Sequence, residues 1–328
     1  MGDGVNEAGA GDLGLNERSW MIADRVAAQA TALRVAVHTL EGGARVIDAG
    51  VEVDGGLGAG LALAELCMGG LGHVSLAQVT VGGDTYAGVQ VWTDHPAVSC
   101  MASQYAGWAV QVGTFFAMGS GPLRAHARVE RELFERLHYG EQARRGVLVL
   151  EARALPTSEV AAWLGAKSGL APAEITCAVA PTASLAGGVQ VVARVLETGL
   201  HKMDTLGFDV TRVVSGIGSA PLPPVAKNDL RAIGRTNDCI LYGGQARYTV
   251  RARDDELSAL AERLPASASA DFGTPFYDIF ERCGRDFYKI DPLLFSPAEV
   301  WLTSAVSGRT FHAGRLEPEV LRASLLGA

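Results

Sequence analysis

Residues 180–235 read APTASLAGGVQVVARVLETGLHKMDTLGFDVTRVVSGIGSAPLPPVAKNDLRAIGR, and this stretch decides how the rest of the chain is interpreted. Apolar residues recur there at steps of three and four between positions 184 and 203, which predicts one helix over that range. The sides of this helix are mostly apolar too, so we expect it to be buried. A narrow polar stripe remains, formed by Gln190, Arg194, Glu197 and His201.

The polar stripe leaves two interpretations open. Steps of four, three and four residues place its side chains on one helical face. In the first interpretation this face meets water, and an i,i+3 pair of Arg194 and Glu197 adds only about 0.3 kcal/mol. In the second, the stripe faces a cleft, and the same two side chains are available to act on a ligand.

The composition favours a well-packed protein. The chain has 328 residues, of which 48% are hydrophobic and 20% are charged. That length suggests two domains or one large α/β unit. A net charge of −8 argues against nucleic acid as the main partner, although a local basic pocket still admits an anionic small ligand.

The cysteines number five, are scattered, and form no C-x-x-C motif. This usage indicates a reducing compartment without a disulfide framework, and no Cys/His spacing suggests a zinc site. We therefore expect no bound metal. No apolar run reaches transmembrane length and no leader pattern opens the chain, so we expect a cytoplasmic protein with no membrane partner.

The order of the expected elements is mixed, with several consecutive strands, which predicts an α/β fold with mixed sheets. Residues 1–12 are rich in glycine and acidic residues and are expected to be disordered. The polar segment 140–145 has the composition of a linker. We place the domain boundary there, with an N-terminal α/β domain at 13–145 and a C-terminal α/β domain at 146–328, and we allow segments of the two to interleave.

Three further segments carry specific expectations. Residues 55–60, GGLGAG, join a strand to a helix, but Leu61 replaces the third glycine of a G-x-G-x-x-G motif, which argues against a dinucleotide site. This loop either contacts an anion through its amides or packs closely on its neighbours. The segment that opens at residue 97 is expected to begin as a polar loop. Residues 239–243 are apolar and are expected to form a buried strand.

Several blocks of sequence carry a family resemblance. They are GARVIDAGVEVDGGLGAGLALAELCMGGLG (43–72), SCMASQYAGWAV (99–110), GSGP (119–122), ARVLETGLHKMDTLGFD (193–209), GIGSAPLPP (216–224), GRTNDCILYGG (234–244), DFYKIDPLLFSPAEV (286–300) and SGRTFHAG (307–314). Each block alone is a weak signal. In their shared order and spacing they resemble the methenyltetrahydromethanopterin cyclohydrolase family, over nearly the whole chain after about residue 13.

This resemblance implies two α/β domains side by side with a large ligand pocket between them, assembled as a homotrimer. It implies a hydrolase of one-carbon metabolism, such as the formaldehyde oxidation of methylotrophs, that interconverts 5,10-methenyltetrahydromethanopterin and water with N5-formyltetrahydromethanopterin. The family uses no metal or redox cofactor, and its partner is the small-molecule pterin. The catalytic Arg and Glu of its R-x-x-E motif fall on Arg194 and Glu197.

Those two residue types suit the implied chemistry. The methenyl bridge is an amidinium-like cation, so the enzyme has only to position a water and remove its proton, which Glu197 can do. A neighbouring cation lowers the pKa of this carboxyl, whereas burial raises it, and the sequence does not decide between them. Arg194 is open to three roles: it orients Glu197 and keeps it ionised, it binds a polar edge of the pterin, or it only solvates Glu197 within the fold.

Other polar residues are candidates for substrate contacts, each with a structural alternative. His201 continues the polar stripe by one turn, where a histidine is also commonly structural. An Asx turn before a strand explains Asn237 and Asp238 as well as a pterin contact does. The full set of candidates is Gln190, His201, Lys202, Arg235, Asn237, Asp238, Ser103 and Gln104.

Three rival functions remain to be weighed against the structure. A cysteine nucleophile at Cys100 or Cys67 needs a histidine placed beside it, and neither cysteine lies in a recognisable motif. A non-catalytic pterin-binding module predicts ligand binding without turnover. A nicotinamide-dependent dehydrogenase is already disfavoured by the incomplete glycine motif.

Overall fold

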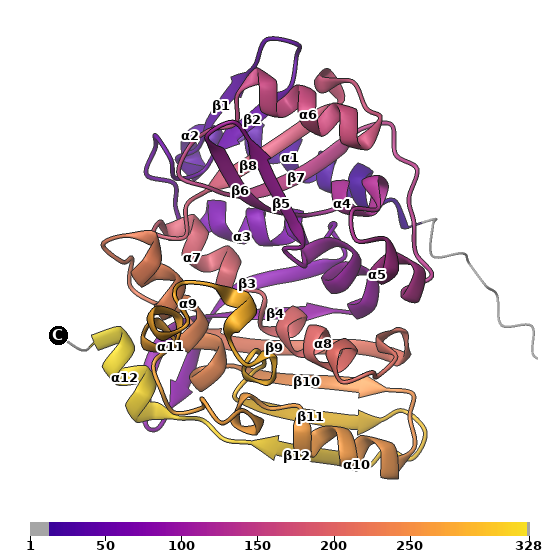
Figure 1. Cartoon of the computed structure of the whole chain (residues 1–328), viewed down its shortest axis with the longest axis vertical. Helices are drawn as coiled ribbons and strands as arrows, with labels where there is room; N and C mark the ends of the chain where they lie inside the picture. Colours follow the sequence, from indigo (N-terminus) through magenta and orange to yellow (C-terminus); the bar gives the residue numbers. More distant parts are fainter. Residues whose placement is uncertain (1–12, 327–328) are drawn as a thin grey trace, which may run out of the picture.

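The computed structural model describes residues 13–326, so the disorder expected for residues 1–12 lies outside the described part of the chain. Its framework is a pair of six-stranded sheets, one above the other in Figure 1. Sheet A has the order β1 (Ala36–Thr39), β2 (Arg45–Asp48), β8 (Ile175–Ala180), β7 (Gly146–Glu151), β6 (Phe115–Ser120), β5 (Trp108–Val112). Sheet B has the order β12 (Thr310–Gly314), β11 (Glu299–Ser304), β10 (Gln245–Val250), β9 (Val213–Pro221), β4 (Asp84–Thr93), β3 (Gly72–Val81).

Both sheets are mixed, as the sequence predicts. In sheet A, β8 pairs in parallel with β2 and β7, and the other ladders are antiparallel. In sheet B, only the β10–β11 ladder is parallel. Every residue of β8 is buried, because parallel strands of this kind are covered on both faces. The α/β class with mixed sheets is therefore confirmed.

Helices cover both faces of sheet A and one face of sheet B. Alternate residues of β7 and β8 pack on α1 (Leu15–Ala28) and α3 (Leu57–Cys67), and the intervening residues pack on α6 (Ser158–Ser168). The helices α3 and α7 (Leu185–Val192) lie between the two sheets in Figure 1. The helix α8 (Val195–Thr205) packs on the inner face of sheet B, where Leu196 meets Gly216 and Gly218.

The remaining described helices are mostly short. The α-helices are α2 (Ala30–Leu33), α4 (Leu123–Ala127), α5 (Arg131–Arg136), α9 (Asp229–Gly243), α10 (Asp254–Arg263), α11 (Phe276–Arg282) and α12 (Pro318–Leu326). Segment η2 (Ala97–Gln104) is a π-helix, and 3-10 turns occupy η3 (Pro172–Glu174), η4 (Val210–Arg212), η5 (Ala266–Ala268), η6 (Phe287–Lys289) and η7 (Pro292–Leu294). Across the described residues, none of the helices has the length and apolar character needed to span a bilayer.

The proposed boundary between residues 145 and 146 does not separate the two sheets. Strand β6 precedes it and β7 follows it, yet they pair within sheet A with Met118 opposite Glu151. The β3–β4 hairpin comes from the N-terminal half but joins sheet B, where β4 pairs with β9. The segments interleave because the chain crosses between the sheets more than once, and residues 140–145 are only a connection between α5 and β7.

The helix expected over residues 184–203 is interrupted. It forms as α7 and α8, which meet at Ala193 and Arg194. The carbonyl of Ala193 accepts a hydrogen bond from the Gln104 side chain over 3.1 Å, and the Arg194 amide bonds only to the nearer carbonyl of Val191. In an unbroken helix the Ala193 carbonyl would accept a backbone amide one turn further on. Here it accepts the Gln104 side chain from η2 instead, and the helix is interrupted at this point.

Two other local predictions are wrong. Residues 239–243 form the end of α9, which starts at residue 229 with Asn228 as its N-cap, so no Asx turn precedes a strand there. A short apolar run fits a buried helical face as well as a strand, and periodicity alone cannot separate them. Residues 97–104 are the π-helix η2, and not a loop.

Candidate active site

The break between α7 and α8 fixes the two residues of the R-x-x-E motif. Arg194 is the N-cap residue of α8, and Glu197 lies in the first turn of that helix. Both side chains are buried, with relative exposures of 9% for Arg194 and 6% for Glu197. The positive end of the helix dipole therefore lies beside Glu197 and favours its ionised form.

The guanidinium of Arg194 is held by three acceptors from three different elements. It donates to the backbone oxygen of Gln104 in η2, to Ser120 Oγ at the end of β6 over 3.0 Å, and to Gln190 Oε1 in α7 over 3.1 Å. A planar guanidinium suits this arrangement because its donors point in fixed directions. Arg194 is therefore locked in place before any ligand arrives.

Glu197, in contrast to the Arg194 guanidinium, has no such partners within the described part of the chain. Among the described residues its carboxyl makes neither a hydrogen bond nor an ion pair, and this includes Arg194. Burial raises the pKa of Glu197 above its ordinary value, and the charges of Arg194, His201 and Arg124 oppose that rise. A buried carboxyl with free oxygens and opposing influences on its pKa is suited to accept and return a proton.

Arg124 is a cation that the sequence analysis did not select. Its side chain is fully buried, forms an ion pair with Glu130 at 2.9 Å, and donates to the Ser103 carbonyl over 3.1 Å. Its charge also acts on Glu197. The available signal was its place two residues after the GSGP block, between Leu123 and Ala125.

A polar cluster lies behind Arg194. Ser120 Oγ is 3.3 Å from Cys67 Sγ, and Ser103 Oγ donates to the Cys67 carbonyl over 2.5 Å. Burial raises the pKa of Glu151, while a hydrogen bond from Thr182 and the charge of Arg194 oppose that rise. Ser103 and Ser120 thereby connect η2, α3 and β6 around the arginine.

His201 lies one helical turn after Glu197 on α8 and borders an open space. Its ring stacks on Tyr105, with ring centroids 4.9 Å apart and planes 18° apart. The pair borders a hollow of about 460 Å³ beside α8. The hollow is lined by Met101, Tyr105, Glu130, Arg131, Glu132, Leu133, Arg136, His201 and Asp204.

The structure brings only part of the predicted set together. Gln190, Ser103, Gln104 and His201 lie around the Arg194–Glu197 pair through the contacts given above. The side chain of Gln104 is committed to the helix break, with its Nε2 on the Ala193 carbonyl. These residues therefore form one constellation from η2, α7 and α8.

The other predicted residues lie elsewhere. Lys202 is fully buried, and its ammonium donates to the Pro265 carbonyl over 2.7 Å and to the Leu293 carbonyl. Asp238 accepts hydrogen bonds from the Phe276 amide over 2.8 Å and from Ser324 Oγ over 2.5 Å. Both hold the fold together, because each ties a helix to a distant segment.

Arg235 and Asn237 lie on α9 and are only partly buried. The Asn237 amide donates to the Ile233 carbonyl of its own helix over 2.8 Å. The Arg235 guanidinium donates to the Pro224 carbonyl over 3.4 Å, beside a small hollow of about 30 Å³ between α7 and residues 222–226. Neither side chain contacts the Arg194 constellation by a hydrogen bond.

The thiols do not support a cysteine nucleophile. Cys67 and Cys100 are both buried, with relative exposures of 1% and 0%. Burial raises the pKa of each thiol, which disfavours the reactive thiolate. The polar partners of Cys67 are Ser120 and Gln190, and no histidine bonds to either thiol among the described residues.

Comparison with known proteins identifies the family of this chain. The family model described as "Cyclohydrolase (MCH)" matches residues 14–325. The chain is 48% identical to the methenyltetrahydromethanopterin cyclohydrolase of Methylobacillus flagellatus, over 89% of each chain. It is 47% identical to the enzyme of that name from Methylobacterium organophilum and 40% identical to the one from Methanococcoides burtonii, in both cases over 94% of this chain and 97% of the relative. The chain therefore belongs to the MCH family, the methenyltetrahydromethanopterin cyclohydrolases, which are hydrolases of a cyclic carbon–nitrogen bond.

Proposed function

We propose that this chain catalyses the reversible hydrolysis of 5,10-methenyltetrahydromethanopterin to N5-formyltetrahydromethanopterin, with Glu197 as the base that activates water. The names of the relatives support the reaction. The observation that carries the residue assignment is a buried carboxyl without a hydrogen-bond partner among the described residues, next to a guanidinium that is fixed by its own acceptors. A structural glutamate at this depth would be expected to be hydrogen-bonded.

The proposed steps follow from the charge of the substrate. The methenyl carbon already carries positive charge, so an ionised Glu197 both offsets that charge and removes a proton from the attacking water. The adduct is a neutral carbinolamine. Its collapse breaks the bond to the arylamine nitrogen, which takes one proton from Glu197, while the hydroxyl proton is released. One proton is released overall, and the steps as written use no metal or redox cofactor.

In this proposal Arg194 is a positioning residue. Three of its five N–H donors bond to Gln104, Ser120 and Gln190, and among the described residues no bond to Glu197 is formed, so Arg194 acts on Glu197 through its charge. That charge, with the N-terminus of α8, keeps Glu197 ionised until the substrate and water are bound. Gln190, Ser103 and Gln104 then serve the reaction by holding Arg194 and η2.

We place the substrate in the hollow beside α8. The stacked rings of Tyr105 and His201 offer a flat wall next to Glu197, and a pterin is a flat heterocycle. His201 therefore remains a candidate for a substrate contact. Lys202, Asn237 and Asp238 are left out of the binding set because their polar atoms are engaged within the fold.

Assembly and location complete the proposal. We propose a homotrimer, supported by a row of side chains across the outer face of sheet B. The register aligns His73, Trp92, Ile217, Arg247, Trp301 and His312 across six strands. Trp92 is 43% exposed and Ile217 is 40% exposed, as expected of a face that meets another subunit. A cytoplasmic location, without a membrane or nucleic-acid partner, is proposed on the charge and cysteine usage of the sequence.

The test of the reaction is a spectrophotometric assay of the purified chain. Methenyltetrahydromethanopterin is mixed with the protein, methenyltetrahydrofolate serves as the matched control substrate, and the loss of the methenyl chromophore is followed. Rapid loss with the methanopterin substrate alone supports the proposal. Loss at the buffer rate with both substrates contradicts it and favours a pterin-binding module.

A further inference from the structure

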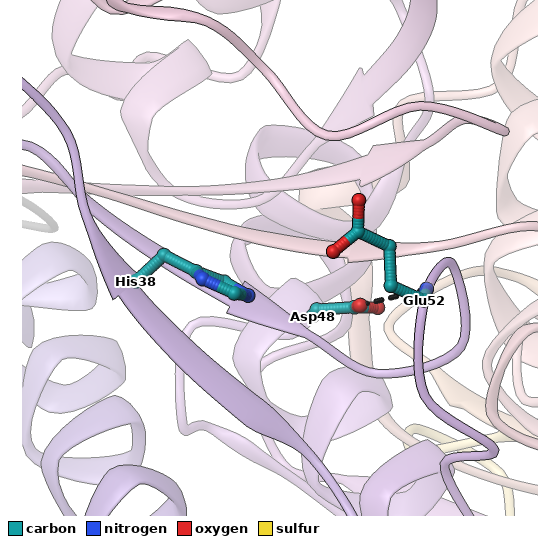
Figure 2. Close-up of side chains that lie close together, drawn as sticks. All are labelled: His38, Asp48 and Glu52. Carbon is teal, nitrogen blue, oxygen red and sulfur yellow. Dashed lines mark hydrogen bonds between the residues drawn. The ribbon is translucent and has the colours of Figure 1, made fainter.

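Three side chains with metal-ligand chemistry meet at the outer end of sheet A. They are His38, Asp48 and Glu52, and one potential ligand atom from each lies within 4.8 Å of the others. Figure 2 shows the His38 imidazole directed toward the Asp48 carboxylate, with the Glu52 carboxylate next to it. None of the three belongs to the Arg194 constellation, and the sequence analysis selected none of them.

The strand register brings His38 and Asp48 together. In the antiparallel β1–β2 ladder, Ala36 is opposite Asp48 and His38 is opposite Val46. Ala36 and His38 share a face of the strand, so His38 and Asp48 are diagonal neighbours on one side of the sheet. Diagonal neighbours lie within reach of each other's longer side chains.

The Asp48 carboxylate is fixed by the turn that follows β2. Its Oδ1 accepts the amides of Gly50 over 2.9 Å and Val51 over 2.7 Å, and its Oδ2 accepts the amide of Glu52 over 2.8 Å. These bonds fold residues 49–52 back, which brings Glu52 to the carboxylate that it caps. They leave acceptor capacity on the carboxylate, because its two oxygens offer about four sites.

His38 supplies an independent observation. Its Nε2 is buried and has no hydrogen-bond partner among the described residues. A buried imidazole nitrogen is normally paired, since leaving it unpaired costs about 1–3 kcal/mol. A metal ion bound between His38 and Asp48 would give this nitrogen the partner that it lacks.

The charge of the cluster also favours a bound cation. Within residues 13–326, no ion pair involves His38, Asp48 or Glu52, so no basic side chain is paired with either carboxylate. Bonds of about 2.0–2.2 Å place the ligand atoms of a tetrahedral ion about 3.3–3.6 Å apart. The three ligand atoms lie within 4.8 Å of one another, so binding would draw them closer together, and the exposed Glu52 side chain has room to rotate.

We propose that His38, Asp48 and Glu52 form a binding site for a first-row divalent transition metal, with Zn²⁺ as its representative. An imidazole together with carboxylates suits ions of this class, whereas Mg²⁺ and Ca²⁺ prefer oxygen ligands alone. Three protein ligands leave at least one position for water. The bound ion joins the edge strand β1 to the turn after β2.

This site has a structural consequence for α7. A Cβ at Gly50 would lie 2.8 Å from Ser184 Oγ, so the turn packs directly on the N-cap residue of α7. A metal that joins this turn to β1 would therefore also stabilise the start of α7, the helix that carries Gln190. The expected effect of the metal is therefore on the stability of the fold, and it does not depend on the proposed reaction.

The test uses the full-length chain, without a histidine tag and stripped of metal. Zn²⁺ is added, the unbound metal is removed by dialysis, and the bound metal is measured by elemental analysis alongside the thermal midpoint. Wild type is expected to retain one equivalent more Zn²⁺ than His38→Ala and Glu52→Gln, and its Tm rises on addition of Zn²⁺ whereas the Tm of these two variants does not. Glu41→Gln, an exposed acid in the turn before β2, is the matched control and behaves as wild type.

The two variants differ in their effect on folding, so loss of metal binding can be told apart from loss of structure. Glu52 is exposed, so Glu52→Gln leaves the packing intact even if His38→Ala unfolds the edge strand. Equal Zn²⁺ retention in wild type and Glu52→Gln overturns the proposal, as does wild type that retains none. A dissociation constant for Mg²⁺ or Ca²⁺ that is equal to or below that for Zn²⁺ overturns the assigned class of ion.

Discussion

The Arg194 guanidinium donates to Ser120 Oγ over 3.0 Å, and this bond turns it toward β6. Glu197, in the first turn of the helix that Arg194 caps, has no ion pair with it among the described residues. The two residues therefore interact through their charges alone. The carboxyl oxygens stay free for water, while the cation still opposes the effect of burial on the pKa of Glu197.

This separation predicts the behaviour of two arginine variants. Arg194→Met removes a charge that lowers the pKa of Glu197, so that pKa should rise further. Activity needs ionised Glu197, and the acidic limb of the rate profile should move to higher pH. Arg194→Lys keeps a charge and should restore part of the shift, although it loses the planar fork and turns over more slowly.

The measurement is kcat against pH for wild type and both variants, with thermal midpoints as a check on folding. Arg253→Lys, an exposed arginine at the start of α10, is the matched control and should keep the wild-type profile. An unchanged acidic limb in Arg194→Met would show that the guanidinium does not set the ionisation of Glu197.

Asp238 predicts a pH dependence of stability. Burial raises the pKa of Asp238 to about 7, whereas an aspartate in an unfolded chain ionises near pH 4. Between these values the folded protein binds more protons than the unfolded chain, so the contribution of Asp238 to stability is present at low pH and is lost as pH rises toward 7 and beyond. Asp238→Asn stays neutral and lacks this dependence.

The check is denaturant unfolding of wild type and Asp238→Asn at several pH values from 4 to 8. The stability of wild type relative to the variant should fall with rising pH, by a few kcal/mol in all at about 1.4 kcal/mol per pKa unit. Because only the difference is used, other titrating groups cancel. A difference that is constant with pH would contradict the account.

A Lys202 variant tests whether this residue has a structural role or contacts the substrate. Its ammonium bonds to the carbonyls of Pro265 and Leu293, and burial lowers its pKa to about 7. Lys202→Met should destabilise the fold by about 2–4 kcal/mol, because two buried carbonyls lose their donor. The KM for the pterin should stay within about twofold of wild type. A large rise in KM without loss of stability would return Lys202 to the binding set.

Gly199 is required by a close approach between α8 and sheet B. A Cβ at this position would lie 2.2 Å from Tyr248 Oη, which donates to the Leu196 carbonyl over 2.9 Å. Gly199→Ala should therefore destabilise the protein by about 1–3 kcal/mol, measured by denaturant unfolding. Combining it with Tyr248→Phe removes the atom in contact, so the double variant should lose less than the sum of the single ones. Strict additivity would argue against this contact as the cause.

Local spacing was enough to place three candidate side chains close together in the sequence analysis. The polar stripe identified Gln190, Arg194 and Glu197 because their spacing is a property of the helix itself, and the break at Ala193 leaves them on neighbouring turns. The α/β class also followed from the order of the segments. The division of the predicted helix into α7 and α8 could not be predicted, because the break depends on a hydrogen bond from Gln104, a residue far away in the sequence.

The remaining features depend on contacts between distant segments. Ser120 bonds to Arg194 and Glu151 interacts with its charge only after β6 and β7 have paired, and no spacing in the sequence predicts that pairing. His38 and Asp48 likewise meet through the β1–β2 register. Residues 239–243 end a helix although the sequence predicts a strand, because four hydrophobic residues and a glycine carry too little periodicity to reveal a helix.

The most direct measurement of the central claim is the turnover of Glu197→Gln with methenyltetrahydromethanopterin. An amide has nearly the shape of the carboxyl but cannot accept the proton of water, so kcat should fall by about 10²–10⁴-fold while substrate binding and the thermal midpoint stay near wild type. Glu262→Gln, an exposed acid on α10, should keep full activity. A Glu197→Gln protein with wild-type kcat would contradict the assignment of Glu197 as the base.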